Sequence, residues 1–213
     1  MNIKFSNLHP VYFSEDRSVR SNIWGQEVTI SPGEKIQIVA PSGSGKTSLI
    51  HFMYGLRSEY TGSISYNGKD VKGLAPDQLA AYRQEHLSIM FQDLRLFTTQ
   101  TVHQNIEVKR QLKPFHPEGK IAEFAERLGI AHKLQMSCST CSYGEQQRVA
   151  IVRCLMQPFD FLLLDEPFSN LDDNNRKKAM ELILEEAEKR NAGILLADLK
   201  QIDFFPADKI FHL

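Results

Sequence analysis

The stretch Ala40-Pro41-Ser42-Gly43-Ser44-Gly45-Lys46-Thr47 organises the whole chain. It follows the run 35–39, which predicts a strand, and leads into 48–53, which predicts a helix. Glycines let successive backbone N–H groups turn toward one centre, and the helix adds its own N-terminal N–H groups. Lys46 can then reach the β- and γ-phosphates of a nucleotide, and the Thr47 hydroxyl can ligate Mg²⁺. This context favours a phosphate-binding loop over an accidental Gly/Ser-rich turn.

The composition is ordinary for a globular protein and limits the possible partners. A length of 213 residues suits one α/β domain with a small subdomain. The net charge of -1 provides no basic field, so we expect no nucleic-acid partner. No run of about 18 apolar residues occurs, and the first residues lack the apolar core of a signal peptide. We therefore expect a cytoplasmic location.

The cysteines do not predict a disulfide framework, because Cys138, Cys141 and Cys154 are too few. Cys138-x-x-Cys141 has the spacing of half a zinc site, but no second pair of Cys or His has matching spacing. We expect buried or passively exposed thiols rather than a metal or redox centre.

Alternating and apolar runs predict the order of the elements. Strands are expected around 3–5, 28–30, 62–66, 87–91, 161–164, 194–197 and 210–211. Helices are expected around 48–53, 76–86, 102–108, 121–128 and 149–155, and after a cap at Asp172 or Asp173. The runs 161–164 and 194–197 are fully apolar, as central parallel strands require. The prediction is a single α/β domain, residues 1–213, in which about 94–140 form a helical subdomain inserted into a core of 1–93 and 141–213.

Two carboxylates follow the predicted strand 161–164. Open α/β sheets bind ligands at the carboxyl ends of their strands, where Asp165 and Glu166 stand. Beside a phosphate loop, Asp165 would hold Mg²⁺ directly or through water, and Glu166 would polarise the water that attacks the γ-phosphate.

A second anion-binding pattern precedes the helix around 149–155. Ser142 and Gly144 lie at the expected helix N-terminus, where backbone N–H groups attract anions. Ser142 with Glu145 three residues later also predicts a capping box, and both roles can hold at once.

Five motifs occur in one order and identify a family resemblance. They are the phosphate loop, Phe91-Gln92-Asp93, Cys141-Ser142-Tyr143-Gly144-Glu145-Gln146, Phe161 to Glu166, and Ser169-Asn170-Leu171-Asp172. They match Walker A, the Q-loop, the signature, Walker B and the D-loop of the nucleotide-binding subunits of ABC (ATP-binding cassette) transporters, which the chain resembles from end to end. The resemblance implies a P-loop NTPase fold with a RecA-like core, an antiparallel β subdomain and an inserted helical subdomain.

The resemblance also implies a role for each matched residue, with ATP and Mg²⁺ as the bound species. The residues implied in nucleotide binding are Tyr12, with Phe13 as the alternative aromatic, Ser42, Gly43, Ser44, Gly45, Lys46, Thr47, Ser48, Ser142 and Gly144. Those implied at the metal are Thr47, Gln92 and Asp165, and those implied in catalysis are Glu166, Gln92 and Lys46.

The family assembles as head-to-tail dimers, so Ser142 and Gly144 of one subunit would meet the γ-phosphate held by another, and Asp172 would cross the interface. The implied partners are a second ABC subunit, the same or different, and an integral-membrane permease. The permease would place the chain at the inner face of the cell membrane.

Several positions depart from the family pattern. Ala40 replaces the first Walker A glycine, a change that looser forms of the motif accept, and Cys141 replaces the signature's leucine. Tyr143 replaces a signature glycine, which adds bulk and disfavours positive φ, so we expect weakened trans binding. Asp198 stands where the family has a switch histidine. An ionised Asp only accepts hydrogen bonds and repels phosphate, so we expect slow hydrolysis with Asp198 turned away or bonded elsewhere.

The amino-acid sequence around the signature, around the D-loop and over residues 87–97 resembles the lipoprotein-release and macrolide-export branch of the family. The alternative function is an ATP-responsive regulatory or scaffold subunit that does not transport. A soluble DNA-repair or translation ATPase is a third option, which the length of the chain disfavours because such proteins carry coiled-coil arms or a second cassette.

Overall fold

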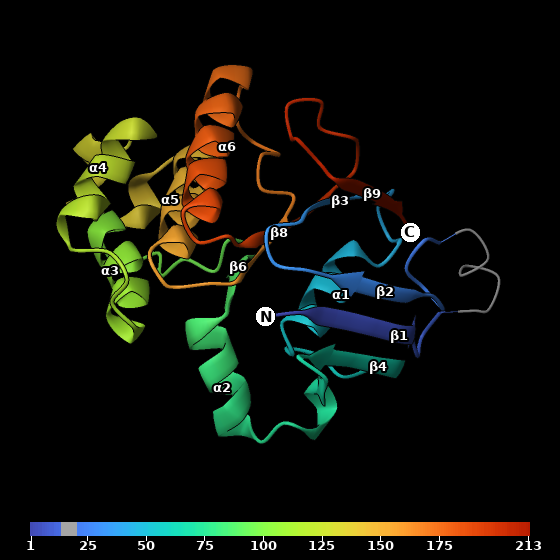
Figure 1. Cartoon of the computed structure of the whole chain (residues 1–213). Coiled ribbons are helices and arrows are strands. Elements are labelled where there is room, and N and C mark those ends of the chain that lie inside the picture. The colour runs from blue at the N-terminus through green and yellow to red at the C-terminus, as the bar shows by residue number, and fades with distance from the viewer. Residues whose placement is uncertain (14–20) are drawn as a thin grey trace.

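The computed structural model describes residues 1–13 and 21–213, which form two sheets with helices between and beside them (Figure 1). The antiparallel sheet has the order β2-β1-β4-β5, and the parallel sheet has the order β6-β7-β8-β3-β9. The antiparallel strands are β1 (Ile3–Pro10), β2 (Glu27–Ile30), β4 (Tyr60–Tyr66) and β5 (Lys69–Asp70). The parallel strands are β3 (Lys35–Val39), β6 (Leu87–Met90), β7 (Phe161–Asp165), β8 (Gly193–Asp198) and β9 (Lys209–His212).

Six α-helices lie within the described residues. They are α1 (Lys46–Met53), α2 (Pro76–Glu85), α3 (Val102–Leu112), α4 (Gly119–Arg127), α5 (Tyr143–Leu155) and α6 (Asp173–Glu188). Single 3₁₀ turns occur at Val71–Gly73, Ala131–Lys133 and Cys138–Thr140. None of the helices in this part of the chain is long and apolar enough to traverse a bilayer.

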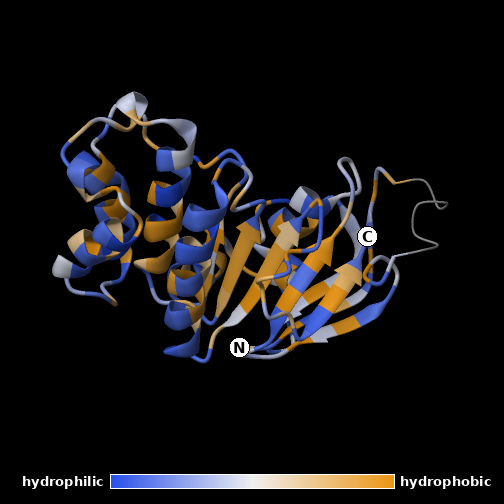
Figure 2. Ribbon diagram, turned by 90° about the horizontal axis from the view of Figure 1, so that it is seen from above, coloured by the Kyte–Doolittle hydropathy of each residue, from blue (hydrophilic) through white to orange (hydrophobic). Residues whose placement is uncertain are grey.

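The parallel sheet separates two hydrophobic cores, because successive side chains of a strand point to opposite faces. Leu162 and Leu164 of β7 pack with α3, α4, α5 and α6 in one core. Phe161 and Leu163 pack with α1 and the antiparallel sheet in the other. Figure 2 shows the resulting band of apolar strands between the helices and the outer sheet.

Most of the predicted elements are confirmed, with differences at particular positions. The helix expected from Val102, Ile106 and Val108 is present as α3, in which Val102 and Ile106 are buried and Val108 is exposed. Asp172, rather than Asp173, caps α6 by accepting from the backbone N–H of Asn175. The short strand β5 carries no apolar signal and was not predicted.

The α/β fold class is confirmed, and the apolar residues of α3 and α4 belong to the same core as those of α5 and α6. This shared core supports treating 94–140 as an insertion rather than a separate folding unit. The division into subdomains stays a prediction.

Candidate active site

The loop between β3 and α1 requires glycine at two positions. Gly43 and Gly45 have φ of 77° and 97°, in the left-handed region that only glycine enters freely. A Cβ on Gly45 would lie 2.9 Å from the Phe13 ring and 3.0 Å from the Trp24 ring. Two aromatic rings therefore press against the loop where its backbone turns.

Lys46 is almost completely buried at the start of α1, with 5% of its surface exposed. Its ammonium donates to the carbonyl oxygens of Ala40 at 2.8 Å and Pro41 at 3.1 Å, and lies 3.7 Å from Oε1 of Glu166. A charged phosphate oxygen is a stronger acceptor for an ammonium than a carbonyl oxygen is. The loop thus holds a cation beneath its glycine-rich turn.

Asp165 ends β7 with 1% of its surface exposed. Neither of its carboxylate oxygens has a hydrogen-bond partner among the described residues, and burial raises the pKa of Asp165 to about 6. A buried carboxylate without partners is costly unless a cation or a proton neutralises it. The Thr47 hydroxyl opposes this rise in the pKa of Asp165, and a carboxylate with a hydroxyl nearby offers the oxygen ligands that suit Mg²⁺.

Glu166 has an unusual backbone, with φ of 48° at a residue that is not glycine. Its N–H donates to the Ala197 carbonyl at 2.9 Å, and its own carbonyl accepts from Nε2 of Gln147 at 3.2 Å. Such a conformation costs about 1–3 kcal/mol and persists only where neighbours hold it. Bonds on both sides of Glu166 turn its carboxylate toward Lys46.

The pocket beside this loop has a volume of about 210 Å³ and collects most of the predicted site residues. Its lining consists of Tyr12, Phe13, Ser42, Gly43, Gly45, Lys46, Thr47, Ser48, Gln92 and Glu166. Oε1 of Gln92 lies 3.4 Å from the Thr47 hydroxyl, which donates to it. The pocket therefore brings together residues of α1 with residues that follow the strands β1, β6 and β7.

Both candidate aromatic residues lie at the pocket. The Tyr12 hydroxyl donates to the Ser48 hydroxyl at 2.5 Å, and its ring is half exposed. The Phe13 ring lies edge-on between Tyr12 and Trp24, with centroid distances of 5.4 and 5.8 Å. The choice of Tyr12 over Phe13 as the adenine platform stays a prediction.

Four predicted site residues do not line this pocket: Ser44, Asp165, Ser142 and Gly144. Ser142 caps α5 in the predicted capping box, because its hydroxyl accepts from the N–H of Glu145 and the Glu145 carboxylate accepts from the N–H of Ser142. A Cβ on Gly144 would come within 2.8 Å of the Asn170 carbonyl. Gly144 therefore also allows the D-loop to approach α5 closely.

Gln147 is a site residue to which the sequence interpretation assigned no role. It is buried in α5, where its Nε2 donates to the Glu166 carbonyl and, at 3.2 Å, to the Ser169 hydroxyl. Its Oε1 accepts from the N–H of Asn170 at 3.0 Å. The available signal was its position: a polar residue four before Ile151, on the apolar face of the helix.

Asp198 is the last residue of β8, the strand that pairs with β7. Its Oδ1 accepts from the N–H of Leu199 at 2.7 Å, and burial raises the pKa of the carboxyl. With Glu166 and Arg176 it lines a neighbouring cavity of about 470 Å³. The expected effect of Asp198 on the rate of hydrolysis stays a prediction.

The three thiols are buried and free. Burial raises the pKa of Cys138 to about 11 and that of Cys154 to about 12, and it also raises the pKa of Cys141. Because the thiolate is the reactive form, these side chains behave as small apolar groups at neutral pH.

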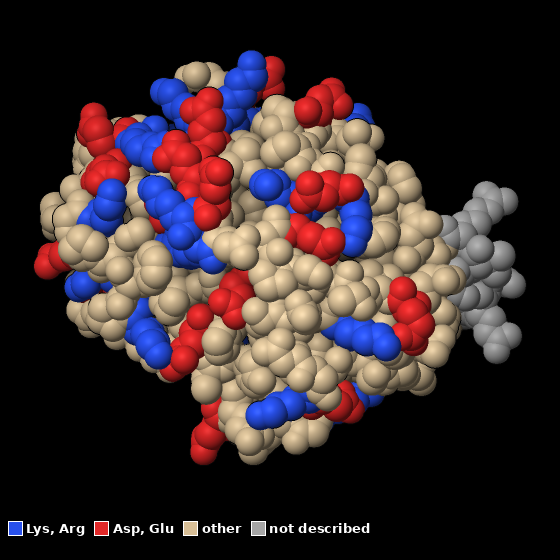
Figure 3. All heavy atoms as spheres, viewed as in Figure 1, with Lys and Arg blue, Asp and Glu red and all other residues tan. Residues whose placement is uncertain are grey.

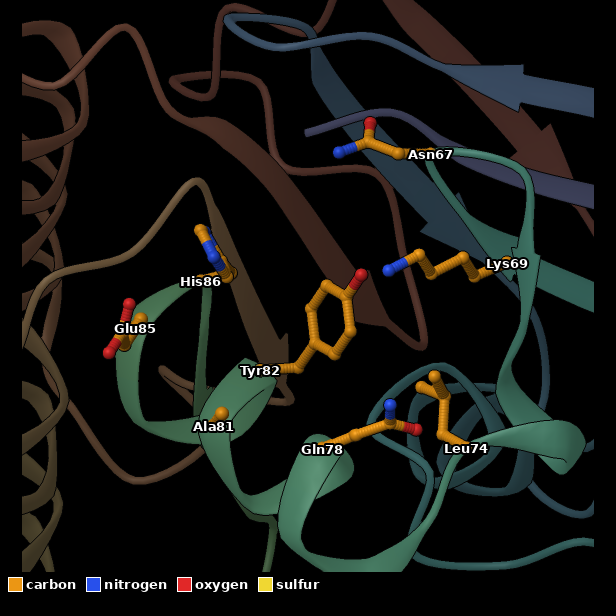
Figure 4. A pocket seen from close by; sticks show the side chains of 8 residues that line it. All are labelled: Asn67, Lys69, Leu74, Gln78, Ala81, Tyr82, Glu85 and His86. Carbon is orange, nitrogen blue, oxygen red and sulfur yellow. The ribbon is translucent and has the colours of Figure 1, made fainter.

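Away from this pocket, the surface carries charges of both signs and one further hollow. Figure 3 shows basic and acidic side chains interspersed over the face in view. A separate hollow of about 250 Å³ lies between α2 and the β4–β5 turn, with the Tyr82 and Lys69 side chains pointing toward each other (Figure 4). No predicted site residue lines this hollow.

Comparison with known proteins places these features in a family. The family described as ABC transporter matches residues 25–169. The lipoprotein-releasing system ATP-binding protein LolD 1 of Rhodopirellula baltica is 34% identical, over 80% of this chain and 76% of that protein. The macrolide export ATP-binding/permease protein MacB of Nitrosomonas europaea is 32% identical over 91% of this chain, which spans 30% of that protein. The dimeric ATP-binding cassette MJ0796, solved with ADP and Pi, has a TM-score of 0.80 over 93% of this chain and 88% of its own, at 22% identity, and shows the same fold.

Proposed function

Because this chain belongs to the ABC transporter family of ATP-binding proteins, we propose that it binds MgATP, hydrolyses it, and drives an integral-membrane permease through ATP-dependent dimerisation. The observation that carries the proposal is the meeting of Lys46, Glu166 and Gln92 around the phosphate loop, together with a buried Asp165 that has no hydrogen-bond partner within residues 1–13 and 21–213.

Each side chain has a task in this reaction. Lys46 would stabilise negative charge on the β- and γ-phosphates, because its ammonium is buried and little screened by water. Glu166 would orient the attacking water and accept its proton. Thr47, Asp165 and Gln92 would hold Mg²⁺, which supplies charge neutralisation at the phosphates when bound.

The position of the signature residues supports a shared site. Ser142 and Gly144 lie outside the pocket of their own chain, at the exposed N-terminus of α5. A helix N-terminus binds anions, so this one is available to the γ-phosphate held by a second chain. Neither chain would complete a site alone, whether the partner is identical or different.

The proposal extends to the branch of the family and to the place of this chain in the cell. LolD 1 and MacB carry lipoprotein release and macrolide export in their names, and we propose a permease of that kind, with this chain bound to its cytoplasmic face. Relatives named for import of sulfonates and of molybdate or tungstate also match, so the permease decides the direction and cargo.

A second candidate is an ATP-responsive regulatory subunit with slow hydrolysis. The acceptor-only carboxylate of Asp198, bonded to the Leu199 N–H, favours it because no histidine is present there to donate to the γ-phosphate. A dimer that forms with ATP but hydrolyses none would select this candidate.

The primary test is Lys46→Ala. We expect steady-state MgATP hydrolysis to fall about 100-fold, because a charged stabiliser of the transition state is lost. ATP binding can be followed separately through Trp24, the single tryptophan, whose ring packs near Gly45.

The matched control is Lys113→Ala, which removes an exposed ammonium paired with Glu85 away from the pocket. Its hydrolysis should equal that of the unchanged protein. Equal hydrolysis by Lys46→Ala and Lys113→Ala would contradict the proposed function.

A further inference from the structure

The side chain of Tyr143 lies against its own chain, although the signature motif faces a partner in the proposed dimer. Tyr143 is the first residue of α5, and 47% of its surface is exposed. Its hydroxyl donates to the main-chain carbonyl of Gln92, with an O···O distance of 3.2 Å. The residue that departs from the family's glycine thus contacts the Q-loop in cis.

The residues before Gln92 are held by aromatic packing. The Phe91 ring contacts His51 and Tyr54 edge-on, with centroid distances of 5.7 and 6.0 Å. The Arg95 guanidinium lies 3.9 Å from the centroid of the same ring. The Q-loop is therefore anchored to α1 on its upstream side.

The residues after Gln92 are held by the signature helix itself. Leu94 and Arg95 have left-handed backbones, with φ of 57° and 48°. Their carbonyl oxygens accept from the buried Arg153 guanidinium, at 2.7 Å for Arg95. Two consecutive residues in this region are strained, so Arg153 stabilises a conformation that the chain would otherwise leave.

Gln92 therefore lies between two fixed segments, and α5 contacts Gln92 itself through Tyr143 and the residues that follow the Q-loop through Arg153. The Tyr143 hydroxyl restrains the main chain of Gln92, while the Gln92 side chain reaches the Thr47 hydroxyl at 3.4 Å. A chain of contacts thus joins the N-terminus of α5 to the proposed Mg²⁺ ligand Thr47 within one subunit.

We propose that Tyr143 is a positioning residue that holds Gln92 against Thr47 of its own chain. A signature residue then acts on the nucleotide site in cis, in addition to the trans contacts of Ser142 and Gly144. The effect on turnover rests on the proposed function, whereas the restraint on the Q-loop does not.

The test is Tyr143→Phe, which removes the hydroxyl and keeps the ring. The first readout needs no nucleotide: trypsin cleavage after Arg95, whose side chain is partly exposed, followed by mass spectrometry. We expect cleavage about threefold faster, in line with the loss of one neutral hydrogen bond.

The second readout is the Mg²⁺ concentration that gives half-maximal ATP hydrolysis. It should rise about threefold, while the KM for ATP at saturating Mg²⁺ stays unchanged. Simple loss of folded protein would lower kcat alone and leave the Mg²⁺ requirement unmoved.

The matched control is Tyr82→Phe, which deletes a tyrosine hydroxyl in the hollow beside α2. It should leave both readouts unchanged. The proposal would be overturned if Tyr143→Phe were cleaved after Arg95 at the same rate as the unchanged protein and needed the same Mg²⁺ concentration. If no variant hydrolyses ATP, the proposed function fails, and cleavage after Arg95 still decides the role of Tyr143.

Discussion

Glu166 and Asp198 are the two carboxylates that bear most directly on the proposed hydrolysis of ATP. Glu166 is turned toward Lys46 by a left-handed backbone that Gln147 and Ala197 hold in place. Asp198 accepts from the Leu199 N–H and offers no donor. In the proposed reaction, Glu166 would therefore orient the attacking water, whereas Asp198 would donate no hydrogen bond to the γ-phosphate.

Replacing Asp198 by histidine should restore that donor. We expect Asp198→His to raise the steady-state rate of ATP hydrolysis about tenfold, because a repelling charge is removed and a hydrogen bond to the γ-phosphate becomes available. The control is Asp203→His, because Asp203 is an exposed carboxylate that lines the same cavity as Asp198. This substitution should leave the rate unchanged. An unaltered rate in Asp198→His would count against the expectation of slow hydrolysis.

At the scale of elements, α6 is tied to the loop between α3 and α4 by a buried ion cluster. Glu186 is fully buried and contacts His116 at 2.8 Å and both Lys189 and Arg190 at 2.6 Å. Burial alone would raise the pKa of Glu186, but the hydrogen bonds from these three groups lower it far below its usual range. The cluster fixes where the helical segment lies against the core.

The cluster predicts a pH-dependent stability. A carboxylate with a lowered pKa stabilises the fold above its unfolded pKa of about 4.3, and this contribution is lost as the pH falls further. Glu186→Gln should lower the free energy of unfolding by about 3 kcal/mol at pH 7, because the buried Arg190 guanidinium loses its counter-charge. In urea unfolding, the difference from the unchanged protein should shrink by roughly half at pH 3.

The neighbouring Glu185 supplies the control for this prediction. Its exposed carboxylate pairs with Arg127, so Glu185→Gln should cost less than about 1 kcal/mol at either pH. Equal destabilisation by the two substitutions would show that burial of the cluster contributes nothing.

For the whole molecule, the proposed unit of function is a dimer that closes on ATP. Replacing Glu166 by Gln should block hydrolysis and trap this dimer, so gel filtration with saturating MgATP should show a dimer. The double variant Glu166→Gln with Lys46→Ala should stay monomeric, because the γ-phosphate that would meet the partner chain is no longer held in place by Lys46. A monomer in Glu166→Gln at high ATP would indicate that Tyr143 has disabled the trans contact.

Local sequence was sufficient to predict most elements and the phosphate loop. Residues 40–47 specify their turn because Gly43 and Gly45 permit positive φ that other residues resist, and the flanking strand and helix follow from periodicity. The capping box of Ser142 and Glu145 was equally readable, since all its atoms lie within four residues.

Only the tertiary structure revealed the contacts between segments far apart in sequence. The hydrogen bonds of Gln147 to Glu166 and the D-loop, of Arg153 to the carbonyls of Leu94 and Arg95, and of Tyr143 to Gln92 span 19 to 59 residues. No periodicity encodes such pairs, because they depend on how α5 packs against the edge of the parallel sheet. The sequence therefore specified a nucleotide-binding loop from local backbone geometry, and packing decided which side chains hold Glu166 and Gln92 beside it.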